Sequence, residues 1–248
     1  MKIAIAQRFL PSRSRGGVGY FTHGLANALI QRGHAVTVIS QDPKPKDALY
    51  AVQCLDENKI SKWAPLAFPF QLTQVDFSKF DVLHAQGDDQ WLSKKIPRVR
   101  TLHGSSWVEA WHNGVVRGSP KHFFLHAYYY LWEWIADLRA DYVTAVSVAT
   151  GHYYPRLHEV IGNGIDLNFF KPGNAKSGAP SILFVGEIHS RKRGDLLLKI
   201  FQKEIRQAVP NAELWMVCPE KVEGPGIRCF SKMETKELAQ LYQKAWVF

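Results

Sequence analysis

The stretch that decides the fold is residues 181–198, which read SILFVGEIHSRKRGDLLL. An unbroken apolar run at 182–185 is typical of a strand that is buried on both faces. A polar loop follows it, ends in the basic run Arg191–Arg193, and leads into a helix-forming stretch that opens at Gly194. This order is typical of a phosphate site in an α/β sheet, because strand ends and helix N-termini attract anions. A solvated surface run is the alternative interpretation of the three basic residues.

The chain is long enough for one and a half to two α/β domains. It has 248 residues, of which 46% are hydrophobic and 12% aromatic, so a packed core is expected and disorder is not. The formal net charge of +9 suits an anionic small ligand, an acidic membrane surface or nucleic acid. Since no basic stripe with interleaved aromatic residues is present, we do not expect nucleic acid to be a partner.

The cysteines and the N-terminus indicate a cytoplasmic protein. Cys54, Cys218 and Cys229 are odd in number and lack metal-ligand spacing, which is typical of reduced thiols. The first residues, MKIAIAQRFLP, are interrupted too soon for a signal peptide, and no run of about 18 apolar residues follows anywhere. We therefore expect a cytoplasmic chain without a membrane span.

The N-terminal residues predict a βαβ unit with a glycine-rich first turn. An apolar strand at 2–6 is followed by the glycines GGVG at 16–19, a helix to about Arg32 and a second strand at 35–39. These glycines do not match G-x-G-x-x-G, so a NAD site is not indicated. The loop either lets the backbone approach a ligand closely or serves only for packing.

Further buried strands are expected, each followed by a small or polar turn. They lie at 81–85, 98–103, 141–147 and 157–161, with a weaker candidate at 50–55. Two of them carry histidines at their carboxyl ends, His84 and His103, where parallel sheets bind ligands. A hydrogen-bonded loop histidine is the alternative for either one. Residues 63–69 contain two prolines and are predicted to be a loop.

A long aromatic segment at 121–139 contains FFLHAYYYLWEWIADL and predicts a helix that is apolar on nearly every side. One interpretation is a core helix beneath the sheet. The other is a surface that meets lipid or a lipid-linked acceptor, since Trp and Tyr favour membrane interfaces. The second interpretation implies peripheral contact with the inner face of a membrane.

A segment rich in Gly, Pro and Lys divides the chain. It covers residues 168–180 and follows the turn-forming pair Asn163-Gly164, either of which can take a positive φ. We therefore expect an N-terminal Rossmann-like domain at 1–167, a linker at 168–180 and a second αβ domain at 181–248. In the second domain, strands are expected at 213–217 and 227–230, helices near 194–208 and 235–244, and an apolar strand start at 245–248.

Four stretches, in this order and spacing, resemble glycosyltransferase family 4, the retaining nucleotide-sugar transferases. The first is GGVGYFTHGLANALIQRGHAVTVIS at 16–40, and the second is TLHG at 101–104. The third is VIGNGID at 160–166, which is similar to the family's V-I-P-N-G-V-D. The fourth is 181–198, which is similar to V-G-R-L-x-x-x-K-G. The ordered set covers nearly the whole chain.

The resemblance implies a GT-B fold, in which two Rossmann-like domains with mostly parallel sheets carry the acceptor mainly on the first and the donor mainly on the second. It implies transfer of a sugar from a nucleoside-diphosphate sugar, with retention of configuration. No bound metal and no cofactor beyond the donor are implied. The acceptor stays open, with lipid-linked molecules and saccharides as candidates.

The resemblance also implies roles for single residues. Lys192 matches the lysine that contacts the donor diphosphate. Gly16 and Gly17 match the loop whose backbone approaches the donor phosphates and the reacting sugar. His103 matches a catalytic histidine near the reaction centre.

Other matches concern the domain junction and the basic loop. Asn163 and Gly164 match the junction turn and are implied to bind the donor. Glu187 stands where the family has an arginine, so one diphosphate contact is missing, for which Arg191 or Arg193 could substitute.

The end of the chain departs from the family pattern. There, the strand that begins at 246–248 leads to a stretch with two glutamates, which binds the donor ribose and sugar and is not in this sequence. We therefore expect a C-terminally incomplete second domain and a chain that is inactive as written. The alternative is a non-catalytic remnant that acts as a binding or interaction protein, which Glu187 also favours.

Overall fold

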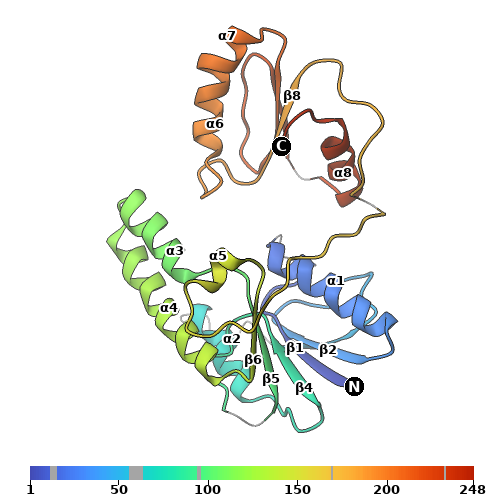
Figure 1. Cartoon of the computed structure of the whole chain (residues 1–248), viewed down its shortest axis with the longest axis vertical. Coiled ribbons are helices and arrows are strands. Elements are labelled where there is room, and N and C mark those ends of the chain that lie inside the picture. Colours follow the sequence, from blue (N-terminus) through green and yellow to red (C-terminus); the bar gives the residue numbers. More distant parts are fainter. Residues whose placement is uncertain (12–15, 56–63, 94–95, 169, 232) are drawn as a thin grey trace. The chain divides into compact units, whose positions relative to one another are not determined.

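The computed structural model describes residues 1–11, 16–55, 64–93, 96–168, 170–231 and 233–248. The chain forms two compact units, Met1–Gly164 and Ile165–Phe248 (Figure 1). Each unit carries a parallel sheet with helices, so the α/β class predicted from the sequence is confirmed. None of the helices in these ranges is long and apolar enough to cross a membrane.

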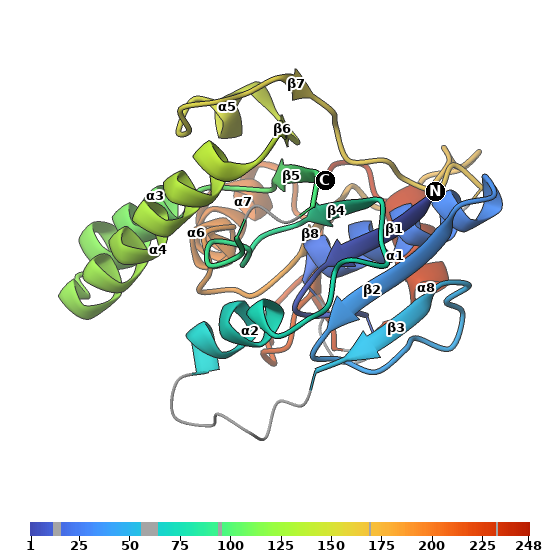
Figure 2. The same ribbon diagram turned by 90° about the horizontal axis from the view of Figure 1, so that it is seen from below.

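Unit 1 is built on a seven-stranded parallel sheet. Its strands are β1 (Lys2–Ala6), β2 (Ala35–Ser40), β3 (Ala51–Cys54), β4 (Val82–Ala85), β5 (Arg98–Leu102), β6 (Tyr142–Ala145) and β7 (Glu159–Val160). They are ordered β3-β2-β1-β4-β5-β6-β7, and Figure 2 shows β3, β2, β1 and β4 side by side. The order reverses between β1 and β4, so the carboxyl ends of these strands flank the crevice where such sheets bind ligands.

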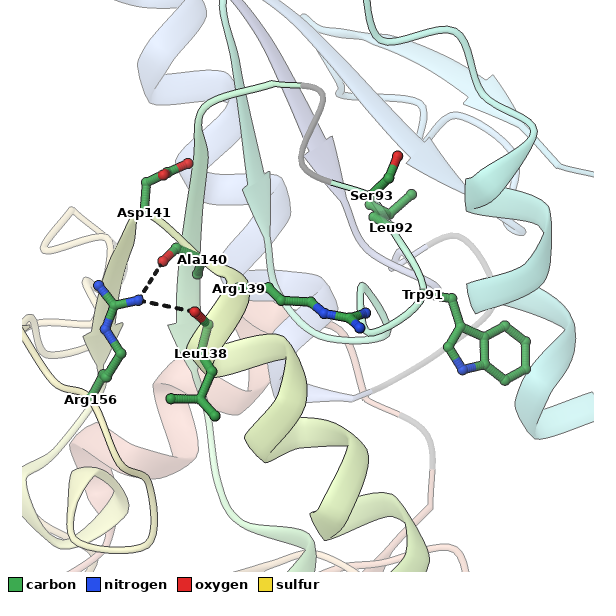
Figure 3. A pocket seen from close by; sticks show the side chains of 8 residues that line it. All are labelled: Trp91, Leu92, Ser93, Leu138, Arg139, Ala140, Asp141 and Arg156. Atoms are coloured by element: carbon green, nitrogen blue, oxygen red, sulfur yellow. Dashed lines mark hydrogen bonds between the residues drawn. The ribbon is translucent and has the colours of Figure 1, made fainter.

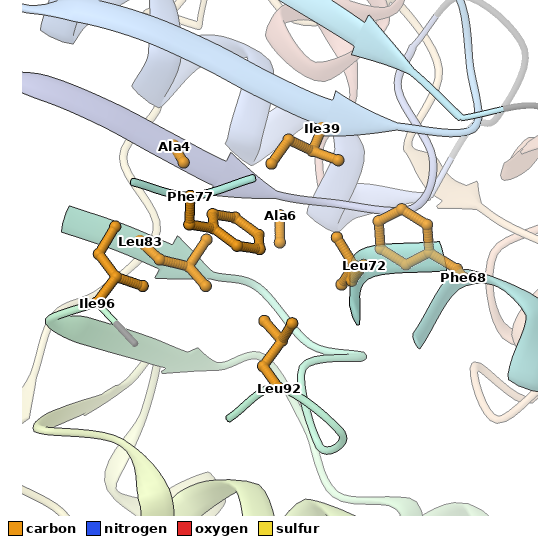
Figure 4. Packing of buried hydrophobic residues seen from close by; sticks show 9 residues of the cluster. All are labelled: Ala4, Ala6, Ile39, Phe68, Leu72, Phe77, Leu83, Leu92 and Ile96. Atoms are coloured by element: carbon orange, nitrogen blue, oxygen red, sulfur yellow. The ribbon is translucent and has the colours of Figure 1, made fainter. Parts of the chain in front are cut away.

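Helices cover both faces of this sheet, because successive residues of its central strands point to opposite faces and are apolar on both. The helical segments are α1 (Gly17–Gln31), α2 (Ala64–Thr73), α3 (Ser106–Ala110), the π-helical η2 (Trp111–Val116), α4 (Pro120–Arg139) and α5 (Val148–Gly151). Ile3 and Ile5 of β1 pack in one core cluster together with residues of α1. Ala4 and Ala6 pack in another cluster, together with residues of α2 (Figure 4).

The prediction of a loop at 63–69 is wrong for its described residues, which belong to α2. Pro65 falls in the first turn, where backbone N–H groups have no helical partner in any case. Pro69 lies inside the helix, which costs about 3 kcal/mol. Phe68 and Leu72 are fully buried against the sheet, and their burial contributes about 2 kcal/mol each. Tertiary packing therefore outweighs the local penalty.

Helix α4 is not a core helix beneath the sheet, so that interpretation of its aromatic sequence is wrong. Only Ala136 and Asp137 are buried in it. The side chains of Phe124 and Leu131 are 71% and 58% exposed. One face of the helix therefore presents a large apolar surface to solvent.

Unit 2 carries a three-stranded parallel sheet of order β10-β9-β8. Its elements are β8 (Ser181–Val185), α6 (Gly194–Ile200), the π-helical η3 (Phe201–Ile205), α7 (Arg206–Ala208), β9 (Glu213–Val217), β10 (Ile227–Phe230) and α8 (Thr235–Lys244). They match the strands and helices expected from the sequence. Beyond α8, Val247 forms a parallel bridge with Ile182, so the last residues lie beside β8.

The described part of 168–180, the segment predicted as a linker, belongs to unit 2. The backbone N–H of Ser177 donates to the carbonyl of Lys244 over 2.9 Å. Nζ of Lys176 donates to the carbonyl of Ala245 over 2.7 Å. These bonds hold the end of the segment against the end of α8.

Candidate active site

The carboxyl ends of β4 and β5 bring together two polar side chains, Gln86 and His103. Each follows the last residue of its strand, and the two strands are neighbours in the sheet. Nε2 of His103 lies 2.6 Å from Oε1 of Gln86. Since an amide oxygen can only accept, this bond assigns the imidazole proton to Nε2 and leaves a lone pair on Nδ1.

Burial keeps the imidazole of His103 uncharged. It lowers the pKa of His103 to about 4, so the imidazole is neutral at pH 7. The ring of Phe21, from α1, packs edge-on against it with 5.0 Å between centroids. Nε2 of Gln86 is buried and has no hydrogen-bond partner among the described residues. The pair therefore offers one acceptor and one unpaired amide donor, which together are complementary to a hydroxyl group.

The other candidate histidine, His84, has internal partners. Its Nε2 lies 2.7 Å from the hydroxyl of Thr101, which in turn lies 2.8 Å from the hydroxyl of Thr144. Burial, helped by the nearby His103, lowers the pKa of His84 to about 4. These contacts connect β4, β5 and β6 within the sheet, so a structural role accounts for His84.

The loop after β4 is anchored by a buried ion-pair cluster. The carboxylate of Asp89 is fully buried, contacts the guanidinium of Arg100, and lies 3.4 Å from Nη1 of Arg98. Both arginines are also buried. The cluster fixes a loop in which Gly87 has a φ of +140° and Asp88 a φ of +59°. A left-handed backbone is uncommon for a residue with a side chain and is often found at functional sites.

Asp88 was not singled out in the sequence, although it follows the strand that flanks the crevice. Its carboxyl is half-buried and has no hydrogen bond or ion pair with another described residue. Burial raises the pKa of this carboxyl, and the nearby charges of Arg8 and Arg100 oppose that effect. The adjacent pair Asp88-Asp89 directly after a buried strand is the signal that could have identified this loop.

Glu133 of α4 fixes the turn that carries His103. Its carboxylate accepts hydrogen bonds from the hydroxyl of Ser106 over 2.6 Å and from the backbone N–H of the same residue over 3.1 Å. The hydroxyl of Tyr154 lies 2.6 Å from Glu133 Oε2 and 2.9 Å from the carbonyl of Gly104. No sequence motif indicates this network, because its members come from parts of the chain that are far apart in the sequence.

The glycines of the loop at 16–19 differ in how closely other residues surround them. Gly16 precedes α1 as its N-cap, and Gly17 is the first helical residue, while residues 12–15 lie outside the described part. A Cβ at Gly17 would have no atom of the described residues within 4 Å, whereas one at Gly19 would lie 2.7 Å from the carbonyl oxygen of Phe9. Packing therefore accounts for Gly19, whereas no described residue crowds Gly17.

In unit 2, Lys192 lies at the carboxyl end of β8. Its Nζ donates a hydrogen bond to the carbonyl of Val185 over 2.8 Å. Gly186 makes room for this side chain, since its φ is +148° and a Cβ there would lie 2.6 Å from Cδ of Lys192. Arg191 and Glu187 are both exposed in the same loop. Arg191 and Lys192 thus lie together on unit 2, whereas His103, Gly16 and Gly17 belong to unit 1.

The junction residues are exposed and irregular. Asn163 and Gly164 lie at the end of unit 1, in backbone that is neither helix nor strand. Neither has a positive φ, although both residue types can adopt one. Among the described residues, no three His, Cys, Asp or Glu side chains form a group that could hold a metal.

A pocket of about 550 Å³ lies at the other edge of the sheet, near the amino ends of β5 and β6 (Figure 3). Its residues are Trp91, Leu92, Ser93, Leu138, Arg139, Ala140, Asp141 and Arg156. Nη1 of Arg156 donates to the carbonyls of Leu138 and Ala140 and so satisfies the end of α4. The pocket is separated from His103 by the length of β5.

Comparisons with known proteins identify the family of this chain. The model of Glycosyltransferase Family 4 matches residues 15–169. Sucrose-phosphate synthase from Thermosynechococcus elongatus has a similar structure, with a TM-score of 0.72 and 14% identity over 98% of this chain and 73% of that chain. WaaG, a glycosyltransferase involved in lipopolysaccharide biosynthesis, gives a TM-score of 0.66 and 13% identity over 98% and 73%. No curated protein matches the sequence.

A glycosyltransferase from Rickettsia africae is also similar, with a TM-score of 0.59 and 15% identity over 98% of this chain and 71% of that chain. At such identities, these structures show the fold alone, and they confirm the GT-B type. The family match covers most of unit 1, including the glycine loop, His103 and the junction. The chain therefore belongs to glycosyltransferase family 4.

Proposed function

We propose that this glycosyltransferase moves a sugar from a nucleoside-diphosphate sugar to its acceptor, with retention of configuration. Family membership supports glycosyl transfer, and the donor class is the finer step. One support for it is the S. aureus MnaA–UDP structure, which is similar in fold, with a TM-score of 0.60 and 14% identity over 99% of this chain and 73% of that chain.

The observation that carries the proposal is the buried pair of His103 and Gln86 beside the crevice of the unit 1 sheet. A neutral imidazole with a free Nδ1 accepts a hydrogen bond from a sugar hydroxyl, and the unpaired amide of Gln86 donates one to a sugar oxygen. Leaving that buried donor unpaired costs about 1–3 kcal/mol, which a bound sugar would recover. In this proposal His103 contacts the reacting sugar.

The basic loop of unit 2 is the proposed diphosphate contact. Departure of the nucleoside diphosphate increases negative charge on its phosphates, so a positioned cation lowers the barrier. In this proposal Lys192 and Arg191 supply that charge. Gly16 and Gly17 are proposed to bind the donor through their backbone, as the family resemblance implies. Asn163 and Gly164 are also proposed to bind the donor.

Other parts of the proposal rest on the sequence. No metal and no cofactor beyond the donor are proposed. The acceptor is a saccharide or a lipid-linked molecule, and the location is the cytoplasm or the inner face of a membrane. The expectation that the 248-residue chain is inactive stays a prediction, so donor binding rather than turnover is the first readout.

A second candidate function is donor binding without transfer. The observation that favours it is Glu187, whose exposed carboxylate lies in the loop that holds Lys192. A carboxylate there opposes the charge of a diphosphate. Binding of a nucleotide sugar with no release of nucleoside diphosphate, in the presence of saccharide and lipid-linked acceptors, would favour this candidate.

The test is calorimetric titration of the chain with uridine, guanosine and adenosine diphosphates and with their glucose conjugates. We expect the nucleoside diphosphate of one base to bind, and its glucose conjugate to bind more tightly than the free diphosphate. Proton NMR of any transfer product then reports the anomeric configuration, which should equal that of the donor. If no nucleoside diphosphate binds, the proposed donor class is wrong, and an inverted anomer would contradict retention alone.

A further inference from the structure

The outer face of α4 carries an apolar stripe, formed by Phe124, Tyr128, Leu131 and Leu138. These residues recur every three, four or seven positions, so they share one side of the helix. Phe124, Leu131 and Leu138 are 71%, 58% and 55% exposed, and Tyr128 is also exposed. A soluble domain normally turns such a stripe toward its core, so this face is adapted to an apolar partner.

The neighbouring segment extends the apolar surface. Trp107, Trp111 and Val115 recur every four residues through α3 and η2, and all three are exposed. Figure 1 shows α3 and α4 side by side, and the ring of Trp107 contacts those of Phe123 and Tyr130. The two segments form one helical hairpin, residues 106–139, with aromatic and aliphatic side chains on its outside.

The exposed charges of this hairpin are all basic. Arg117 and Lys121 lie at its turn, and Arg139 lies at the far end of α4. The two acidic residues of α4 are directed inward. The carboxylate of Glu133 is bonded to Ser106 and Tyr154, and that of the buried Asp137 accepts the backbone N–H of Arg156. The third, Glu109, is half-buried and accepts a hydrogen bond from Asn113.

We infer that the hairpin docks on the surface of an anionic phospholipid bilayer. Tryptophan, tyrosine and aliphatic side chains enter the boundary between headgroups and acyl chains, while basic residues remain among the anionic headgroups. The hairpin lies on the bilayer rather than crossing it, since no described helix is long and apolar enough to span. This inference is independent of the sugar-transfer chemistry.

Charge favours a bilayer over a second copy of the chain. Both ends of α4 carry exposed basic residues, Lys121 at one end and Arg139 at the other. Two stripes that paired in parallel or in antiparallel would therefore bring like charges together, with no exposed carboxylate of the hairpin to neutralise them. Anionic lipid supplies the opposite charge along the whole stripe.

The test is sedimentation of the full chain with two kinds of vesicle, phosphatidylcholine alone and phosphatidylcholine mixed equally with phosphatidylglycerol. The wild-type chain should bind the anionic vesicles and bind much less to the neutral ones. The double variant Phe124→Gln/Leu131→Gln should lower the partition coefficient on the order of 100-fold, because two anchors no longer enter the bilayer. The matched control is Leu49→Gln, which removes a similarly exposed leucine (55%) outside the hairpin and should bind like wild type.

A second variant separates the charge from the apolar anchors. Arg117→Gln/Lys121→Gln should lower binding to anionic vesicles by roughly 25-fold and leave the weak binding to neutral vesicles unchanged. All these positions are exposed, so circular dichroism and thermal midpoints should match wild type.

Three results would overturn the inference. One is a wild-type chain that does not sediment with anionic vesicles at low salt. Another is a Phe124→Gln/Leu131→Gln variant that binds them like wild type. The third is a wild-type dimer in analytical ultracentrifugation that the same variant converts to a monomer without any change in lipid binding, which would assign the stripe to a second copy.

Discussion

His103 and Gln86 show how much a single residue's role depends on its partner. The histidine could be predicted from the sequence, because it ends a buried strand and belongs to a family motif. Gln86 could not be identified as its partner, since the two lie 17 positions apart and meet only through the pairing of β4 with β5. Glu133 was missed for the same reason, because its partners are set by tertiary contacts rather than by a local pattern.

Replacing Gln86 should separate site residues from sheet residues. We expect Gln86→Leu to weaken binding of a nucleotide sugar about tenfold, since one hydrogen bond to the sugar is lost, and to change thermal stability little. The contrasting variant is His84→Ala, which leaves the Thr101 hydroxyl without this partner and should lower the free energy of unfolding by about 1–3 kcal/mol. Calorimetry and urea unfolding measure the two effects. Equal ligand affinity in Gln86→Leu and wild type would remove Gln86 from the site.

The two histidines should make stability depend on pH. Between about pH 6.5 and 4, the unfolded chain binds protons on His84 and His103, but the folded protein does not, because burial lowers both pKa values to about 4. The free energy of unfolding should therefore fall as pH drops below 6.5, by up to about 2 kcal/mol for each histidine at pH 5, and show no such contribution above 6.5. Urea unfolding at pH 7 and pH 5 measures the difference. A His84→Gln/His103→Gln variant with the same drop as wild type would rule out these groups as the cause.

At the scale of elements, apolar runs predicted most strands, because a buried strand is a continuous local signal. Helix α2 was missed, since its two prolines oppose helix formation locally and only the burial of Phe68 and Leu72 against the sheet compensates. Helix α3 was missed because it has five residues, too few for a periodic pattern. Its start is marked by Ser105, whose hydroxyl accepts the N–H of Trp107 over 3.2 Å.

The start of α1 offers a matched pair of glycine variants. Gly19→Ala should lower the free energy of unfolding by about 1–3 kcal/mol, because its Cβ would lie 2.7 Å from the carbonyl oxygen of Phe9. The Cβ of a Gly17→Val variant would have no atom of the described residues within 4 Å, so we expect stability to change little and donor binding to weaken instead. Thermal unfolding and calorimetry separate the two. A Gly17→Val protein that is unstable yet binds donor normally would make packing the reason for this glycine.

At the scale of the whole molecule, the division into two units follows from where the cores lie. The sheet of unit 1 has clusters on both faces, formed within residues 1–164, whereas the cores of unit 2 lie around β8 and β9. The sequence predicted two domains with a linker at 168–180, whereas unit 2 begins at Ile165 and includes the described part of that segment.

A fragment of residues 1–164 should therefore fold alone. Its seven strands and both covered faces are contained in that range, so we expect a cooperative thermal transition by circular dichroism, with a midpoint within a few degrees of the first transition of the full chain. A fragment that melts without a cooperative transition would show that unit 1 depends on unit 2.

We propose that Lys192 contacts the diphosphate of the donor and that His103 contacts its sugar. The most direct test of this claim is calorimetric titration of wild type, Lys192→Ala and His103→Ala with a nucleoside diphosphate and its sugar conjugate, with Lys199→Ala as the control for an exposed lysine of α6. We predict that Lys192→Ala lowers the affinity for both ligands about 100-fold, or about 2.7 kcal/mol. His103→Ala should lower the affinity for the sugar conjugate only. Equal binding of both ligands by wild type and by the two variants would contradict the claim.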